Sequence, residues 1–227
     1  MQFENQEYTI LSQKETILPV NKVLQKTYFL LSLTLFFSTF VALVTIMGLI
    51  PYAGPAFTII GMFGLMFLAQ ACRNSKWGLF TVFAFTGFMG YTLAPLLSFY
   101  LQFYNNGGNL IITALGGTGF VFTVLSLYTL ISRKNFDYMA GFLFAAITAV
   151  FLTSVAGIFL DMPILSVLVS CAFILISSGL ILLQTSQIVN GGERNYIMAT
   201  ISLYTSLFNL FVSLLNVLGF FAGNRRN

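Results

Sequence analysis

The sequence predicts an all-α integral membrane protein, built as a seven-transmembrane helix bundle. Of its 227 residues, 58% are hydrophobic and only 7% are charged, whereas a soluble domain carries roughly 25% charged residues. Seven segments are long and apolar enough to cross a bilayer, which takes about 20 residues of helix. Most of these segments are apolar on every side, whereas a helix on the surface of a soluble protein needs a polar face.

The seven segments follow one another with only short breaks. They are predicted at residues 27–49, 54–72, 78–100, 110–131, 138–160, 164–189 and 197–221. Residues that end helices stand between them, in order Pro51 with Gly54, the RNSK stretch at 73–76, NNGGN at 105–109, RKNFD at 133–137, Asp161 with Pro163, and NGGERN at 190–195. Because every connection is short, successive helices are expected to be antiparallel neighbours.

The two ends of the chain are predicted to be tails. Residues 1–26 are polar and mixed in charge, unlike a secretory signal peptide, so the first span is expected to stay as an anchor. Residues 27–221 form the transmembrane domain, and residues 222–227 form a short C-terminal tail. With the N-terminus in the cytoplasm, eight Lys and Arg lie inside and only Arg225 and Arg226 outside. The positive-inside rule therefore favours this orientation, although a re-entrant last segment would bring both arginines inside.

The sequence argues against several classes of function. It contains no histidine, the commonest acid/base group and metal ligand. No charged residue lies in the middle of a predicted span, and its two cysteines, Cys72 and Cys171, are far apart. The Lys and Arg are scattered over loops and ends rather than clustered for nucleic-acid binding. We therefore expect no enzyme activity, no metal or cofactor site, and no nucleic-acid partner.

Neutral polar residues recur on one face of each of the last two spans. In the seventh span these are Ser202, Ser206, Asn209, Ser213 and Asn216, and in the sixth they are Ser170, Ser177 and Gln184. Their spacings of three, four and seven residues place each set on a single helix face. Unpaired amides are costly in lipid, so the two faces are expected to turn toward each other. They could serve as a helix-contact face or line a narrow hydrated path.

Glycines predict close packing between helices. They are Gly61, Gly64, Gly87, Gly90, Gly116, Gly117 and Gly119. Small residues of this kind let the backbones of transmembrane helices approach. The GGTG run at 116–119 lies inside an apolar span without a lysine, which argues against a phosphate-binding loop.

Long segments of the chain resemble the Bax inhibitor family, and within it the bacterial YccA-like branch. They include FAFTGFMGYTLAPLL at 83–97, ALGGTGFVF at 114–122, FILISSGLILLQTSQIVNGGERNYI at 173–197 and SLYTSLFNLFVSLLNVLGF at 202–220. The resemblance implies that six helices surround a central last helix. It also implies a location in the bacterial inner membrane, with the C-terminus in the periplasm under the orientation above.

Two functions follow from this resemblance. The YccA-like branch is associated with the membrane-anchored ATP-dependent protease FtsH, so our first hypothesis is a protein that binds FtsH and modulates it, as an inhibitor rather than an activator. The alternative is a calcium-permeable leak channel, because some family members are described as channels gated by two aspartates. Those positions correspond to Gln184 and Ser206 here. Both residues are neutral, so the acid-pair gate is expected to be missing, and calcium is the weaker candidate partner.

Overall fold

The computed structural model describes residues 20–75, 77–160 and 163–224. Within these ranges it consists of seven helices and contains no strand, which confirms the predicted all-α class. The helices are α2 (Val20–Ile46), α3 (Pro55–Ala71), α4 (Gly78–Phe103), α5 (Gly107–Ser132), α6 (Met139–Leu160), α7 (Pro163–Val189) and α8 (Tyr196–Asn224). Most of both predicted tails, residues 1–19 and 225–227, lies outside the described residues.

Six of the seven helices are long and apolar enough to cross a membrane. The exception is α3, with 17 residues, which is about 26 Å long at 1.5 Å per residue and stands at the lower limit for a span. Its start is sharply defined, because Pro55 occupies the first turn and Gly54 before it has a φ of 92°. Proline suits this position, where a backbone N–H has no partner within the helix.

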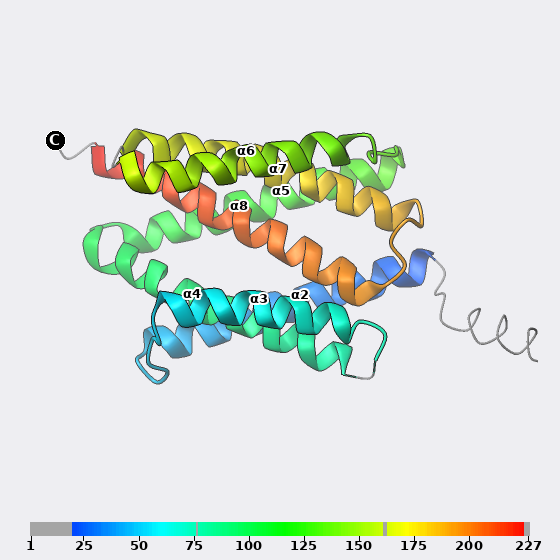
Figure 1. The fold of residues 1–227 in the computed structure, drawn as a ribbon, viewed down its shortest axis with the longest axis horizontal. Helices are drawn as coiled ribbons and strands as arrows, with labels where there is room; N and C mark the ends of the chain where they lie inside the picture. The colour runs from blue at the N-terminus through cyan, green and yellow to red at the C-terminus, as the bar shows by residue number, and fades with distance from the viewer. Residues whose placement is uncertain (1–19, 76, 161–162, 225–227) are drawn as a thin grey trace, which may run out of the picture.

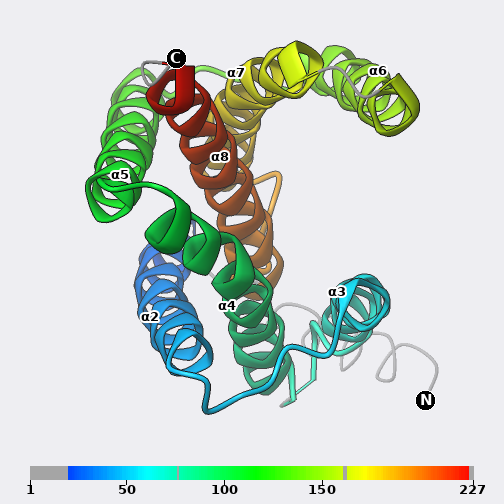
Figure 2. The ribbon, with the colours of Figure 1, turned by 90° about the vertical axis from the view of Figure 1, so that its left-hand side faces the viewer.

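The last helix, α8, is the central element, as predicted, but four of the described helices rather than six pack closely around it. It packs against α7, α5, α2 and α4, and Figure 1 shows it crossing the molecule between two layers of helices. In the end-on view of Figure 2 the helices form an open curve, with α3 at one end and α6 at the other. Helix α3 packs chiefly on α4, and helix α6 packs chiefly on α7. Most of the interior of the bundle is therefore built around α8.

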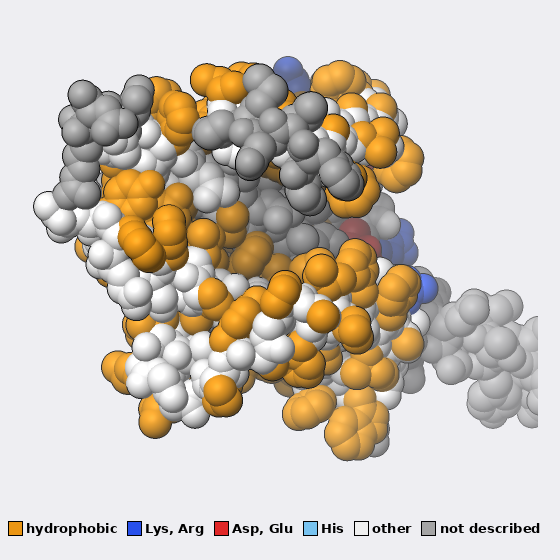
Figure 3. All heavy atoms as spheres, turned by 60° about the vertical axis from the view of Figure 1, so that its left-hand side comes forward, with side chains coloured by type: hydrophobic (Ala, Val, Ile, Leu, Met, Phe, Trp, Pro, Cys, Tyr) orange, Lys and Arg blue, Asp and Glu red, His pale blue; other side chains and the backbone are white. Residues whose placement is uncertain are grey.

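Apolar side chains lie on the outside as well as in the core. The side chains of Leu203, Leu210 and Leu215 on α8 are fully buried. Phe142 and Phe144 on α6 are 72% and 74% exposed, a large apolar surface that would be unfavourable in water. Figure 3 shows hydrophobic side chains spread over the visible face. This distribution suits a protein whose surroundings are lipid.

The glycine prediction holds at some positions and is wrong at others. A Cβ on Gly90 would collide with the backbone carbonyl of Ser38, and one on Gly87 would lie 2.6 Å from the Phe37 ring, so both glycines allow α2 and α4 to pack closely. In contrast, a Cβ on Gly64, Gly116 or Gly119 would meet nothing within 4 Å in the described part of the chain. The GGTG run therefore does not mark a tight crossing.

Candidate functional site on the last two helices

The loop at residues 190–195 joins α7 to α8 and fixes where α8 begins. The Asn195 side-chain oxygen accepts hydrogen bonds from the backbone N–H groups of Ile197 and Met198, at 3.0 and 3.2 Å. This is a helix N-cap, which pairs backbone donors that the first turn leaves free. The Asn195 amide nitrogen donates to the Arg73 carbonyl at 3.0 Å and to the Asn74 side-chain oxygen at 2.9 Å. The start of α8 is thereby tied to the turn between α3 and α4.

The predicted polar faces of α7 and α8 meet at Gln184 and Ser206. The Ser206 hydroxyl donates a hydrogen bond of 3.0 Å to the Gln184 side-chain oxygen, Oε1. Ser206 is 1% exposed, whereas Gln184 is partly exposed. The two residues at the positions of the family's acid pair thus form a neutral, hydrogen-bonded pair that joins the two helices.

The remaining predicted residues have different surroundings. Ser177 and Ser213 are buried, and the Ser177 hydroxyl has no hydrogen-bond partner among the described residues. Asn216 accepts a 3.3 Å hydrogen bond from the Tyr100 hydroxyl on α4 rather than from α7. Asn209 is partly exposed, and its amide makes no hydrogen bond within the described part of the chain. The polar face of α8 is therefore only partly covered by α7.

The uncovered part of this face looks toward the space between α3 and α6. Ser202, Thr205, Asn209 and Asn216 recur at steps of three, four and seven residues, and all four are partly exposed. Neither α3 nor α6 packs closely on α8, and both stand apart from it in Figure 2. Figure 3 shows the surface hollowed between the α6–α7 pair and the α3–α4 pair. The four side chains form what we call the open polar face of α8.

Tyr204 is a buried polar residue that sequence analysis did not identify. Its hydroxyl lies 2.5 Å from the Ser38 hydroxyl on α2 and donates to the Thr86 carbonyl on α4 at 3.2 Å. Its side chain is 2% exposed. It thus links α8 to two helices on the side away from α7. The signal available in the sequence was a tyrosine near the middle of a span, where tyrosine is less common than at the membrane interface.

The chemistry available at this site is hydrogen bonding. Its side chains are amides and hydroxyls, none of which titrates near neutral pH. No group of three His, Cys, Asp or Glu side chains lies together in the described ranges. A hard cation such as calcium prefers carboxylate oxygens, and the Gln184 oxygen already accepts from Ser206. The arrangement suits contacts between helices better than ion binding.

Comparison with known proteins identifies the family. The model of the family described as inhibitor of apoptosis-promoting Bax1 matches residues 20–223, nearly the whole chain. The chain belongs to the Bax inhibitor family. A relative from Escherichia coli K12, named "Modulator of FtsH protease YccA", is 49% identical over 207 residues, which are 91% of this chain and 94% of the relative. An uncharacterized protein of Pseudomonas aeruginosa is 45% identical over 97% of this chain and 99% of its own length.

Membership of the Bax inhibitor family and the apolar helices agree on the cellular location. A relative from a second Escherichia coli strain, with the same 49% identity, is named "Inner membrane protein YccA". Six of the helices in the described part of the chain are apolar and long enough to span a bilayer. This member of the Bax inhibitor family is accordingly a multi-pass protein of the inner membrane.

Proposed function

We propose that this protein binds the FtsH protease within the inner membrane and inhibits it. The observation that carries the proposal is the relative named as a modulator of FtsH, which shares about half of its residues with this chain over almost their full lengths. A relation this extensive makes a shared role the simplest expectation. The site described above suits that role, because it offers hydrogen-bonding groups and no catalytic ones.

The open polar face of α8 is our candidate for the contact with FtsH. An amide that faces lipid without a partner costs several kcal/mol, so a partner helix with polar groups would satisfy Asn209 better than lipid does. Hydrogen bonds between membrane helices contribute about 0.6 kcal/mol each on average. Several of them, supported by close packing, would give a reversible association, as a regulator requires.

The proposed orientation places the N-terminus in the cytoplasm and the C-terminus in the periplasm. The six described Lys and Arg residues, Lys22, Lys26, Arg73, Arg133, Lys134 and Arg194, belong to the start of α2 and to the α3–α4, α5–α6 and α7–α8 connections. These parts of the chain lie at one end of the bundle (Figure 1). Positive charge favours the cytoplasmic side of a membrane.

The test is co-purification of FtsH with the tagged full-length protein from native membranes. We expect FtsH to be recovered, and we expect a reconstituted FtsH to degrade a membrane substrate more slowly when the protein is added. A companion deletion should remove residues 1–19 only, because Val23 and Thr27 are buried in the core. Loss of FtsH on this deletion would place part of the contact in the tail. No recovery from full-length protein, or unchanged substrate turnover, would overturn the proposal.

A single substitution tests the α8 contact. Asn209→Leu removes the unpaired amide, so recovery of FtsH should fall several-fold while the protein stays monodisperse in detergent. The matched control is Thr113→Leu, which removes an exposed polar side chain from α5 that is not part of the open polar face. Equal recovery with both variants would exclude Asn209 from the contact.

A calcium leak is the weaker candidate. The two positions that carry the acid pair in channel-forming relatives hold Gln184 and Ser206 here, which cannot ionise. No feature of the described site favours a divalent cation over a helix contact. Calcium flux in liposomes containing the purified protein, indistinguishable from empty liposomes between pH 6 and 8, is the expected result.

A further inference from the structure

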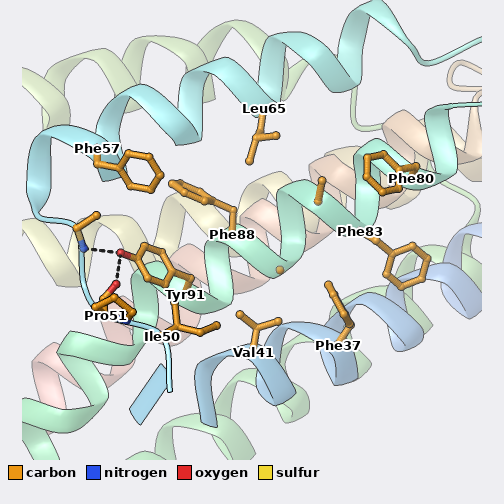
Figure 4. Close-up of a pocket in the computed structure, with 13 residues that line it drawn as sticks. Phe37, Val41, Ile50, Pro51, Phe57, Leu65, Phe80, Phe83, Phe88 and Tyr91 are labelled. Carbon is orange, nitrogen blue, oxygen red and sulfur yellow. Dashed lines mark hydrogen bonds between the residues drawn. The ribbon is translucent and has the colours of Figure 1, made fainter. Parts of the chain in front are cut away.

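A cavity separate from the open polar face of α8 lies between α2, α3 and α4. It has a volume of about 590 Å³, and its lining is almost entirely carbon. Figure 4 shows aromatic rings around it, with Phe37 from α2, Phe57 from α3, and Phe83 and Phe88 from α4. A cavity lined this way does not hold water, which needs two or more polar partners. Its occupant must therefore be apolar.

The length of this cavity, which forms a groove along α4, indicates which kind of apolar molecule could occupy it. It follows one face of α4 from Phe80 to Tyr91, a length of about 16 Å at 1.5 Å per residue. The hydrocarbon core of a bilayer is about 30 Å thick, so one leaflet is about 15 Å deep. A single acyl chain of one leaflet therefore matches the groove in length.

The surroundings of the groove supply such a chain. Phe57 and Phe80 line it and are themselves 52% and 66% exposed, so the groove is continuous with the lipid-facing surface of α3 and α4. The former helix packs chiefly on α4, which leaves its side toward α2 without a protein neighbour at the depth of the groove. An acyl chain of a surrounding phospholipid would fill that space.

One end of the groove is closed and the other is open. At the closed end the Tyr91 hydroxyl accepts a 2.6 Å hydrogen bond from the Ala53 N–H and donates to the Pro51 carbonyl at 3.2 Å, which holds the 50–54 loop over the groove (Figure 4). At the other end a neighbouring hollow shares Phe80 and Phe83 with the groove and reaches Trp77. Tryptophan favours the headgroup level of a bilayer, so a lipid would enter from the Trp77 side.

We propose that the α2–α3–α4 groove binds one acyl chain of a phospholipid whose headgroup lies beside Trp77. In the orientation proposed above this lipid belongs to the cytoplasmic leaflet. The bound chain fills the gap between α2 and α3 and so completes the packing of α3, the shortest of the described helices. This proposal does not depend on the interaction with FtsH.

The test uses the full chain in bilayers of phosphatidylethanolamine and phosphatidylglycerol. A trace of the phosphatidylethanolamine carries a photoreactive diazirine in the middle of one acyl chain, and labelled residues are mapped by mass spectrometry after irradiation. We expect labelling of groove residues such as Leu65 and Phe88 to exceed that of the exposed face of α6 several-fold. Equal labelling of the groove and of α6 would overturn the proposal.

A substitution that fills the groove with a larger side chain provides the second arm of the test. Ala84 lines the groove, so Ala84→Phe should reduce groove labelling to the level seen on α6. The control Ala145→Phe adds the same ring to an exposed position of α6 and should leave groove labelling unchanged. Ala84→Leu, a smaller change, replaces Ala84→Phe if that variant is not monodisperse. Groove labelling that survives a folded Ala84 variant would contradict the proposal.

Discussion

At the scale of single residues, most buried polar groups in this bundle are hydroxyls rather than charges. Many of the threonines donate back to a carbonyl four residues earlier in their own helix, as Thr118 does to Ala114 and Thr205 to Ile201. The hydroxyls of Tyr204 and Ser206 instead join different helices. These two residues are therefore where a change in hydrogen bonding should alter the packing of α8.

Replacing Tyr204 by phenylalanine should destabilise the protein by about 1 kcal/mol, a typical value for a lost intramolecular hydrogen bond. The variant keeps the ring but loses the contacts with Ser38 and Thr86. Unfolding by denaturing detergent in mixed micelles measures the change. Tyr138→Phe is the control, because Tyr138 is 78% exposed and its hydroxyl makes no hydrogen bond in the described structure. Equal stability of the two variants would contradict this role for Tyr204.

The double substitution Gln184→Asp with Ser206→Asp should make the stability of the protein depend on pH. Two carboxylates at hydrogen-bond distance resist full ionisation, so the folded variant holds a proton that the unfolded chain releases. Because the folded state then binds more protons, its stability should fall as the pH rises from about 5 to 8. Thermal unfolding in detergent measures this. The parent, with a neutral pair, should show no such fall from this site, and a variant as insensitive to pH as the parent would refute the expectation.

At the scale of helices, packing is decided by which glycines face a neighbour. Gly90→Ala should cost about 1–3 kcal/mol, the usual range for overpacking, because its Cβ would meet the Ser38 carbonyl. Gly116→Ala should be neutral or stabilising by up to about 1 kcal/mol, because its Cβ meets no neighbour and alanine favours a helix over glycine. Unfolding measurements on both variants test the contrast. Similar losses at both positions would be inconsistent with it.

Helices were predictable from the sequence to different degrees. Hydropathy located all seven of the described helices, but α2 begins at Val20 rather than at residue 27. Hydropathy reports the apolar part of a helix and not the turns beyond it. Periodicity predicted that the faces carrying Gln184 and Ser206 meet. It could not find Tyr204, whose partners Ser38 and Thr86 lie 166 and 118 residues away in the chain. Nor could it separate Gly90 from Gly116, because only the structure shows which neighbours they face.

At the scale of the whole molecule, the distribution of charge relates the fold to the membrane. The start of α5 and the end of α8 lie at one end of the bundle (Figure 1), and the described Lys and Arg lie at the other. If the positive end faces the cytoplasm, the open end of the lipid groove beside Trp77 lies in the cytoplasmic leaflet. The same orientation fixes which end of the open polar face of α8 is nearer the cytoplasm. One labelling experiment tests this orientation.

Single cysteines at opposite ends of the bundle should differ in their access from outside the cell. In a background carrying Cys72→Ser and Cys171→Ser, Gly108→Cys at the start of α5 should react with a membrane-impermeant maleimide on spheroplasts. Lys134→Cys, between α5 and α6, should react only after the membrane is permeabilised. Both positions are exposed, so access depends on the membrane rather than on burial. The opposite pattern would place the basic end in the periplasm, and the acyl chain in the groove would then come from the other leaflet.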